Sequence, residues 1–227
     1  MQEQIKSITE KNFIHITNDI EELVNFIYKE KQEVLLQIIM ERRLNKNKIA
    51  DTLDGFIFQK LIQTNMSTIK LELNKYFPNG VTTLKSSLKL NYQPLQELLI
   101  NQQFQEADKI TNEYLCELVA IQTKNEKKWL YFTDIQFLPV EDLFTLDLLW
   151  KIYSKGKFGF SIQKDIWMKS NKKWDKLWEK ISWTNNGKMK RYPEEFEWTL
   201  TAPKGHLPLS NQLRGTKTLL YLFNHIE

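Results

Sequence analysis

The sequence has a single cysteine, Cys116, in a chain of 227 residues. One thiol excludes an intrachain disulfide and a cysteine-rich zinc site, and such usage is typical of a reducing compartment. No apolar run approaches the roughly 18 residues that a membrane-spanning helix needs. With 41% hydrophobic and 26% charged residues, the composition predicts a globular protein rather than a disordered or membrane-embedded one.

Sequence motifs of common enzymes are absent as well. The chain contains no GxGxxG string, no P-loop, no HExxH and no nucleophile elbow. Its three histidines, His15, His206 and His225, are too widely spaced for a recognisable metal cluster. His206 could act as an axial ligand or a general base, or it could satisfy backbone groups of the loop around it. We therefore expect neither catalysis nor a metal site.

The net charge of +4 favours acidic partners only weakly. Lysine, isoleucine and asparagine are frequent while alanine, glycine, arginine and proline are rare, which indicates an AT-rich genome such as that of an organelle. The first ten residues are polar and contain Glu3 and Glu10, so they resemble neither a signal peptide nor an Arg-rich transit peptide. We expect the protein to act in the compartment where it is made.

The first third of the chain shows the apolar periodicity of helices. Residues 18–46, 49–63 and 68–77 carry apolar side chains three or four positions apart. The breaker Pro78-Asn79-Gly80 follows them. This pattern predicts an N-terminal helical bundle over residues 1–80, with a scaffolding role, and a second domain over residues 81–227.

Helical periodicity continues beyond this boundary. A helix pair is predicted around a short polar link at 101–103, and Asp108 in its second helix could serve a local cap or ion pair. A helix from Pro139 to Lys155 ends at Gly156, and another begins near Phe160. Further helices are predicted over 174–181 and 211–224. The fold class is therefore all-α.

Two aromatic segments interrupt this periodicity and predict long loops with exposed rings. The first, over 123–139, carries Trp129, Phe132 and Phe137, and the second extends over 188–208. Arg214 stands where the last helix begins, so its guanidinium could hold a carboxylate, or could form an ion pair in the core. Two aromatic loops and a basic anchor suit a flat apolar ligand with acidic tails.

The segment 164–191 combines basic and aromatic residues. It holds nine lysines or arginines against three acids, interleaved with four tryptophans, which could form a nucleic-acid surface. The alternative places the tryptophans in a packed stripe and the lysines in water. We favour the packed stripe, and so expect no nucleic-acid partner.

Several strings in this order resemble the genomes-uncoupled-four family of tetrapyrrole-binding proteins. The most specific are SKGKFGFSIQ at 154–163 and APKGHLP at 202–208, and the resemblance covers about residues 84–227. It implies an all-helical core that binds protoporphyrin IX and magnesium protoporphyrin IX without catalysis. It also implies stimulation of magnesium chelatase in chlorophyll synthesis, through that enzyme's large porphyrin-binding subunit. A helical scaffold that contacts the chelatase without binding pigment is the alternative.

The resemblance also implies a site and a location. The pigment would lie in an open cleft bounded by 129–140 and 185–208. The candidate ligand-binding residues are Trp129, Phe132, Phe137, Leu138, Tyr192, Phe196, Trp198, His206, Leu207 and Arg214. The expected location is the plastid stroma, with a plastid gene, or else the cytoplasm of a cyanobacterium, and peripheral association with a membrane is compatible with it.

Overall fold

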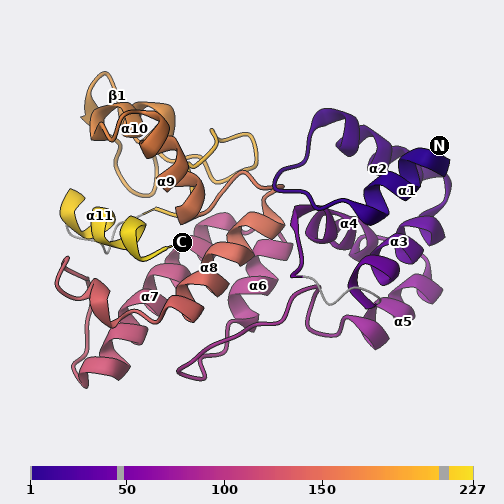
Figure 1. Ribbon diagram of the computed structural model, residues 1–227, viewed down its shortest axis with the longest axis horizontal. Coiled ribbons are helices and arrows are strands. Elements are labelled where there is room, and N and C mark those ends of the chain that lie inside the picture. Colours follow the sequence, from indigo (N-terminus) through magenta and orange to yellow (C-terminus); the bar gives the residue numbers. More distant parts are fainter. Residues whose placement is uncertain (1, 45–48, 210–214, 227) are drawn as a thin grey trace. The chain divides into compact units, whose positions relative to one another are not determined.

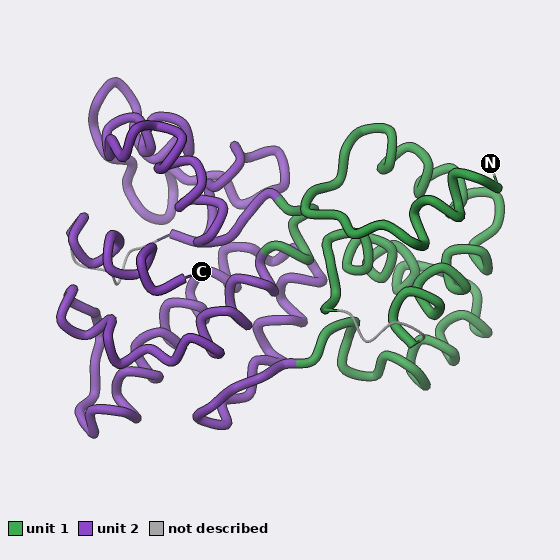
Figure 2. The backbone as a smooth tube through the Cα atoms, viewed as in Figure 1, with its two compact units in different colours: residues 1–83, 151–156 green, residues 84–150, 157–227 purple. Residues whose placement is uncertain are grey.

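The computed structural model describes residues 2–44, 49–209 and 215–226. Eleven α-helices account for most of these residues, and the strands among them form one two-stranded hairpin (Figure 1). This confirms the predicted all-α class. The chain divides into two compact units (Figure 2): unit 1 contains residues 1–83 and 151–156, and unit 2 contains residues 84–150 and 157–227. Within the described residues, no helix has both the length and the apolar character that crossing a membrane requires.

Unit 1 is built around a buried helix. Its helices are α1 (Gln2–Glu10), α2 (Asn18–Glu30), α3 (Gln32–Leu44), α4 (Thr52–Ile62) and α5 (Ser67–Tyr76). The periodicity predicted α2 to α5, whereas α1 was not anticipated because it is polar and short. Helix α4 begins with Asp51, whose carboxylate accepts from two backbone N–H groups in a capping box. It is buried over most of its length, so it forms the core of this unit.

A buried arginine holds three helices of unit 1 together. On α3, Arg42 donates to Asp54 over 2.6 Å and to Asp51 over 2.7 Å, and its Nη1 also donates to the carbonyl oxygen of Ile8 on α1. Each of its three guanidinium nitrogens therefore donates to an acceptor, and such pairing is what makes a buried guanidinium tolerable. The contact fixes α1 and α3 against the start of α4.

Residues 151–156 return the chain to unit 1. The carbonyl oxygen of Tyr153 accepts from Gln59 over 3.3 Å, and that of Lys155 accepts from the N–H of Ile16 over 3.1 Å. Ile152 lies directly against Gly55 on α4, where no side chain intervenes. The sequence analysis divided the chain once, between residues 80 and 81. The return of residues 151–156 could not be predicted from local sequence patterns, because the contacts that place this segment join residues far apart in the chain.

Unit 2 contains the remaining elements. They are α6 (Gln93–Ile100), α7 (Phe104–Thr123), the 3₁₀-helix η1 (Ile135–Phe137), α8 (Val140–Tyr153), α9 (Phe160–Lys169), α10 (Trp174–Lys180), β1 (Thr184–Asn185), β2 (Lys188–Met189) and α11 (Thr216–His225). The last three residues of α8 are counted with unit 1. The predicted pair α6 and α7 is present and joined by a short link.

The aromatic core of unit 2 lies where α7, α8 and the Gly156–Gly159 turn meet. Trp150 stacks on Phe104 with ring centroids 6.0 Å apart, and its indole N–H donates to Thr111 over 3.0 Å. Phe158 meets both rings edge-on. These side chains are fully buried. The turn that carries Phe158 therefore serves packing, and its rings do not form a surface.

A small hairpin, which the sequence analysis did not predict, follows α10. Strands β1 and β2 pair antiparallel, with Asn185 opposite Lys188. The two residues between them both have positive φ, 49° at Asn186 and 75° at Gly187. That combination is the tight hairpin turn for which Asn-Gly is the strongest sequence signal.

The contact between α4 and the return segment gives a first testable prediction. A Cβ on Gly55 would lie 2.3 Å from Cγ2 of Ile152 and 2.5 Å from its carbonyl oxygen. We expect Gly55→Ala to lower the free energy of unfolding by about 1–3 kcal/mol through overpacking, measured by chemical denaturation. Without this contact, the same change inside a helix would raise stability by up to about 1 kcal/mol. A stabilised variant would therefore contradict the placement of residues 151–156.

Candidate functional site

Two loops of unit 2 carry the aromatic residues selected from the sequence. Loop A, residues 124–139, joins α7 to α8, and loop B, residues 184–209, includes the hairpin and follows α10. Figure 1 shows loop A, in pink, beside the yellow helix α11. Contacts of α11 with η1 agree with that view. The two loops differ in how much of their aromatic surface they leave uncovered.

Loop A is held by a buried carboxylate. Asp134 accepts from the backbone N–H of Tyr131 over 2.9 Å and pairs with Lys127 over 3.3 Å. The buried side chains of Leu130 and Ile135 anchor the loop from within. Because the loop is fixed by these groups, its remaining rings can point outward without losing their position.

Three of the predicted loop A rings are exposed. Trp129 is 42% exposed, Phe132 37% and Phe137 40%. Phe132 contacts the ring of Tyr221 on α11, with centroids 5.5 Å apart, and the ammonium of Lys217 lies 5.5 Å from its centroid. The sequence analysis missed these α11 partners, although the predicted helical repeat over 211–224 contains both.

Leu138 is buried, in contrast to the other predicted residues of loop A. Only 2% of it is exposed, and its carbonyl oxygen accepts from Nε2 of His225 over 2.8 Å. Its role in this geometry is to attach the end of loop A to α11. Adjacent residues of loop A therefore differ in role: Phe137 is exposed, whereas Leu138 is buried and supports the loop.

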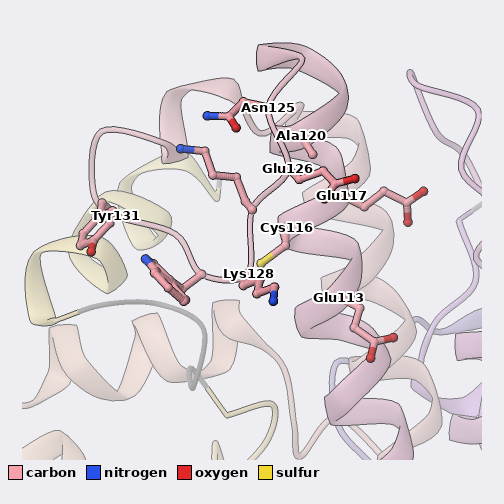
Figure 3. A pocket seen from close by; sticks show the side chains of 10 residues that line it. Glu113, Cys116, Glu117, Ala120, Asn125, Glu126, Lys128 and Tyr131 are labelled. Carbon is pink, nitrogen blue, oxygen red and sulfur yellow. The ribbon is translucent and has the colours of Figure 1, made fainter.

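A pocket of about 810 Å³ lies between α7 and loop A (Figure 3). Its volume is within the range of small-molecule sites. Its lining residues are Glu113, Cys116, Glu117, Ala120, Asn125, Glu126, Lys127, Lys128, Trp129 and Tyr131. Burial, helped by Asp134 and Glu113, raises the pKa of the Cys116 thiol to about 11, so the thiol stays protonated at neutral pH. Trp129 is the predicted residue that this pocket includes.

The predicted rings of loop B contact one another. Tyr192, which is 43% exposed, meets Trp198 edge-on with centroids 5.9 Å apart. The ring centroid of Phe196 lies 6.4 Å from that of Trp198 and 5.6 Å from that of the His206 imidazole. Phe196 and Trp198 are half-buried. The structure thus joins four of the predicted residues into one cluster, with Tyr192 at its open side.

The tryptophans of 164–191 stack in series beside this cluster. Ring centroids are 4.9 Å apart from Trp167 to Trp174, 5.4 Å from Trp174 to Trp178, and 5.2 Å from Trp178 to Trp183. Trp167 and Trp183 are buried, whereas the two between them are half-buried. The rings pack mainly on each other, which agrees with the packed stripe favoured from the sequence. Phe196 of loop B meets Trp183 edge-on, so the stack supports loop B.

His206 and Leu207 lie inside the fold. His206 is fully buried; its Nδ1 donates to the carbonyl oxygen of Ile181 over 2.6 Å, and its Nε2 accepts from the N–H of Glu197 over 3.1 Å. Burial is the main cause that lowers the pKa of His206, so the imidazole is neutral near neutral pH. Both nitrogens already have partners, and an axial ligand role would require the loss of one. Leu207 is also fully buried.

The two signature strings bind each other. Gly205 donates to Lys157 over 2.9 Å, and Gly159 donates to Leu207 over 3.0 Å. The side-chain amide of Gln163 donates to the carbonyl oxygens of Gly205 and Pro208. The segments 157–163 and 202–208 therefore form one frame at the closing end of loop B. Arg214, the remaining predicted residue, lies outside the described part of the chain.

Comparison with known proteins gives a family match that nearly coincides with unit 2. The family model described as GUN4-like matches residues 85–226, which contain nearly all of unit 2. The ycf53 protein of Porphyra purpurea is 46% identical over 191 residues, covering 84% of this chain and 80% of that protein. A match of this length exceeds unit 2 and extends into unit 1.

Two further relatives are more distant. The Arabidopsis thaliana protein named "Tetrapyrrole-binding protein, chloroplastic" is 33% identical over 140 residues, covering 58% of this chain and 52% of that protein. The structure of GUN4 from Chlamydomonas reinhardtii matches with a TM-score of 0.56 and 37% identity, covering 63% of this chain and 94% of that one. Relatives from red algal plastids, a cyanobacterium and a chloroplast confirm the expected location.

The second prediction concerns the frame at the closing end of loop B. Gly205 and Gly187 both have positive φ, 80° and 75°, so a side chain at either position strains the backbone. A Cβ at Gly205 would also lie 2.7 Å from Ile166 and 3.0 Å from Ile181, whereas at Gly187 nothing lies within 4 Å. We expect Gly205→Ala to lose about 1–3 kcal/mol more stability than Gly187→Ala, measured by chemical denaturation. Equal losses would show that close packing at Gly205 contributes nothing.

Proposed function

The chain belongs to the GUN4-like family, and from this premise we propose that it binds protoporphyrin IX and magnesium protoporphyrin IX without catalysing a reaction on them. The resemblance drawn from the two signature strings is thereby confirmed at the level of the family. The name of the Arabidopsis relative supports a tetrapyrrole as the ligand class. The rest of the proposal depends on the surface of unit 2.

The observation that carries the proposal is the exposure of four rings on the two loops. Trp129, Phe132, Phe137 and Tyr192 are each about two-fifths exposed. Tyr131 of loop A and Tyr221, which contacts Phe132 from α11, are exposed as well, so aromatic surface gathers where loop A meets α11. Exposed aromatic groups rimmed by polar residues mark interaction sites. A flat macrocycle would cover such rings by stacking and edge contacts, and would remove apolar area from water on both sides.

Charge near these rings suits the acidic tails of a porphyrin. Lys217 on α11 holds its ammonium over the ring of Phe132, next to the surface that the macrocycle would cover. Arg214 precedes the same helix in the sequence, and we propose it as the anchor for a propionate. A guanidinium pairs with a carboxylate in two parallel hydrogen bonds, which gives orientation as well as affinity.

We further propose that the bound form stimulates magnesium chelatase through its large porphyrin-binding subunit. Family membership supports this role, and the helical surfaces of both units offer area for a protein partner. A scaffold that contacts the chelatase without pigment is the alternative. Exposed rings would suit either ligand or partner, and the name of the Arabidopsis relative favours the pigment.

The third prediction concerns pigment binding itself. Protoporphyrin IX added to the full chain should quench tryptophan fluorescence in a saturable way at micromolar concentration, because Trp129 and Trp198 lie on the two loops. Phe132→Ala should raise the dissociation constant about tenfold, which is equivalent to about 1.4 kcal/mol for one lost ring contact. Phe26→Ala is the matched control, since Phe26 is 47% exposed on α2 of unit 1.

The two hypotheses differ in this titration. Absence of saturable quenching would contradict pigment binding. If the chain still captured the purified large subunit of magnesium chelatase, the scaffold would be the better account. If Phe26→Ala weakened binding as much as Phe132→Ala, the site would not lie on loop A.

The fourth prediction tests the proposed anchor. Arg214→Ala should weaken binding of protoporphyrin with free propionates by about tenfold or more, which corresponds to a charge-assisted hydrogen-bond pair. Binding of the dimethyl ester should change little, because the ester carries no carboxylate. Equal losses for acid and ester, measured by the same titration, would make Arg214 a structural residue.

A further inference from the structure

One peptide group of loop B is held at both of its ends by buried side chains. The carbonyl oxygen of Pro208 accepts from Nε2 of Gln163 over 2.7 Å. The N–H of the next residue, Leu209, donates to Oδ1 of Asp108 over 2.6 Å. These two groups belong to the same peptide bond, so α9 and α7 hold it from its two sides. We call Asp108 and Gln163 the peptide clamp.

From its place in the sequence, Asp108 could serve a local cap or an ion pair, but its observed partner is a distant backbone N–H. Its partner lies 101 positions later, and no ion pair of Asp108 occurs among the described residues. Asp108 is fully buried, and its second oxygen, Oδ2, has no hydrogen-bond partner there. Gln163 also has one buried oxygen without a donor, as does Asn112, one turn after Asp108. The region therefore holds more acceptors than donors.

A buried carboxylate without a cation favours its protonated form. Burial raises the pKa of Asp108 to about 7, while the hydrogen bond from Leu209 acts in the opposite direction. The ionisable group coupled to it is Tyr192 of loop B, whose own pKa is raised by burial and then by the charge of Asp108. Glu106 on α7 acts on that tyrosine and is not among the causes that raise the pKa of Asp108. His206 is neutral and directs both nitrogens elsewhere. Burial is therefore the main cost of ionising Asp108, and no cation among the described residues offsets it.

We propose that Asp108 and Gln163 are positioning residues that fix the closing segment of loop B, residues 205–209, and that the proton on Asp108 decides how firmly this segment is held. The link to pigment affinity rests on the proposed function, whereas the clamp itself does not. With its proton, Asp108 is a neutral acceptor for the Leu209 N–H. Without it, the fold contains a buried charge with one unpaired oxygen, and opening of the segment lets water reach that charge.

The sign of the pH dependence follows from linkage. In the closed segment Asp108 binds its proton more tightly than in water, where its ordinary pKa is 3.8. The closed form is therefore most favoured at low pH, and it loses stability as pH rises towards about 7. Above that value both forms are ionised, and the dependence ends. Opening should increase roughly ten- to thirtyfold between about pH 5.5 and 7.5.

The fifth prediction tests the clamp by amide hydrogen exchange on the full chain. Protection factors of the Leu209 and Gly205 amides, corrected for intrinsic exchange, should fall by roughly ten- to thirtyfold over that pH range. Asp108→Asn keeps an acceptor for Leu209 but has no charge, so its protection should be independent of pH. Gln163→Leu removes the other half of the clamp, so it should lower protection at every pH while it keeps the wild-type slope.

Other outcomes would overturn the proposal. A flat profile in the wild type, or the same slope in Asp108→Asn, would exclude the proton on Asp108 as the cause. If Asp108→Asn failed to fold by circular dichroism, unchanged protection in Gln163→Leu would still refute the clamp.

Pigment titrations at pH 5.5 and 7.5 separate the clamp from the proposed function. The wild type should bind protoporphyrin more weakly at the higher pH, and Asp108→Asn should reduce that difference. Equal pH dependence in both would refute a positioning role at the site. A complete lack of pigment binding would reject the proposed function, and the exchange profiles would then decide on the clamp alone.

Discussion

The segment 205–209 is buried at every position, and a buried loop must find partners for its peptide groups. Its partners belong to the other signature string, to helices α7 and α9, and to the residue that precedes the hairpin, Trp183. The partners are the backbone of Lys157 and Gly159 and the side chains of Gln163, Trp183 and Asp108. This set of bonds fixes the base of loop B. The exposure of Tyr192 above it, and with it the shape of the candidate site, depends on that base.

Much of the helical fold could be predicted, because helices are encoded by local periodicity. The spacing of Leu53, Ile57 and Leu61 anticipated α4, and the Trp174 and Trp178 repeat anticipated α10. Contacts across long separations could not be derived in this way. Neither the return of residues 151–156 to unit 1 nor the bond from Leu209 to Asp108 leaves a local pattern.

The candidate site was predictable in its loops more than in its individual residues. The interrupted helical periodicity indicated both aromatic loops, and the rings of Trp129, Phe132 and Tyr192 are exposed or half-exposed there. The same reasoning included Leu138, His206 and Leu207, which are buried. Exposed and buried positions alternate within a few residues along these loops. Only the contacts of each side chain show whether a residue supports the loop or is exposed, as the two hydrogen-bond partners of the His206 ring do.

The assignment of residues 151–156 to unit 1 has a consequence for the order in which the protein can be completed on the ribosome. Domains commonly fold from the N-terminus as they are synthesised. Here the N-terminal unit lacks the residue that packs on Gly55 until position 152 has been made, after α6, α7 and loop A have already emerged. In nascent chains shorter than this, Gly55 on α4 lacks the cover that Ile152 provides. Completion of the first unit thus waits for the middle of the second.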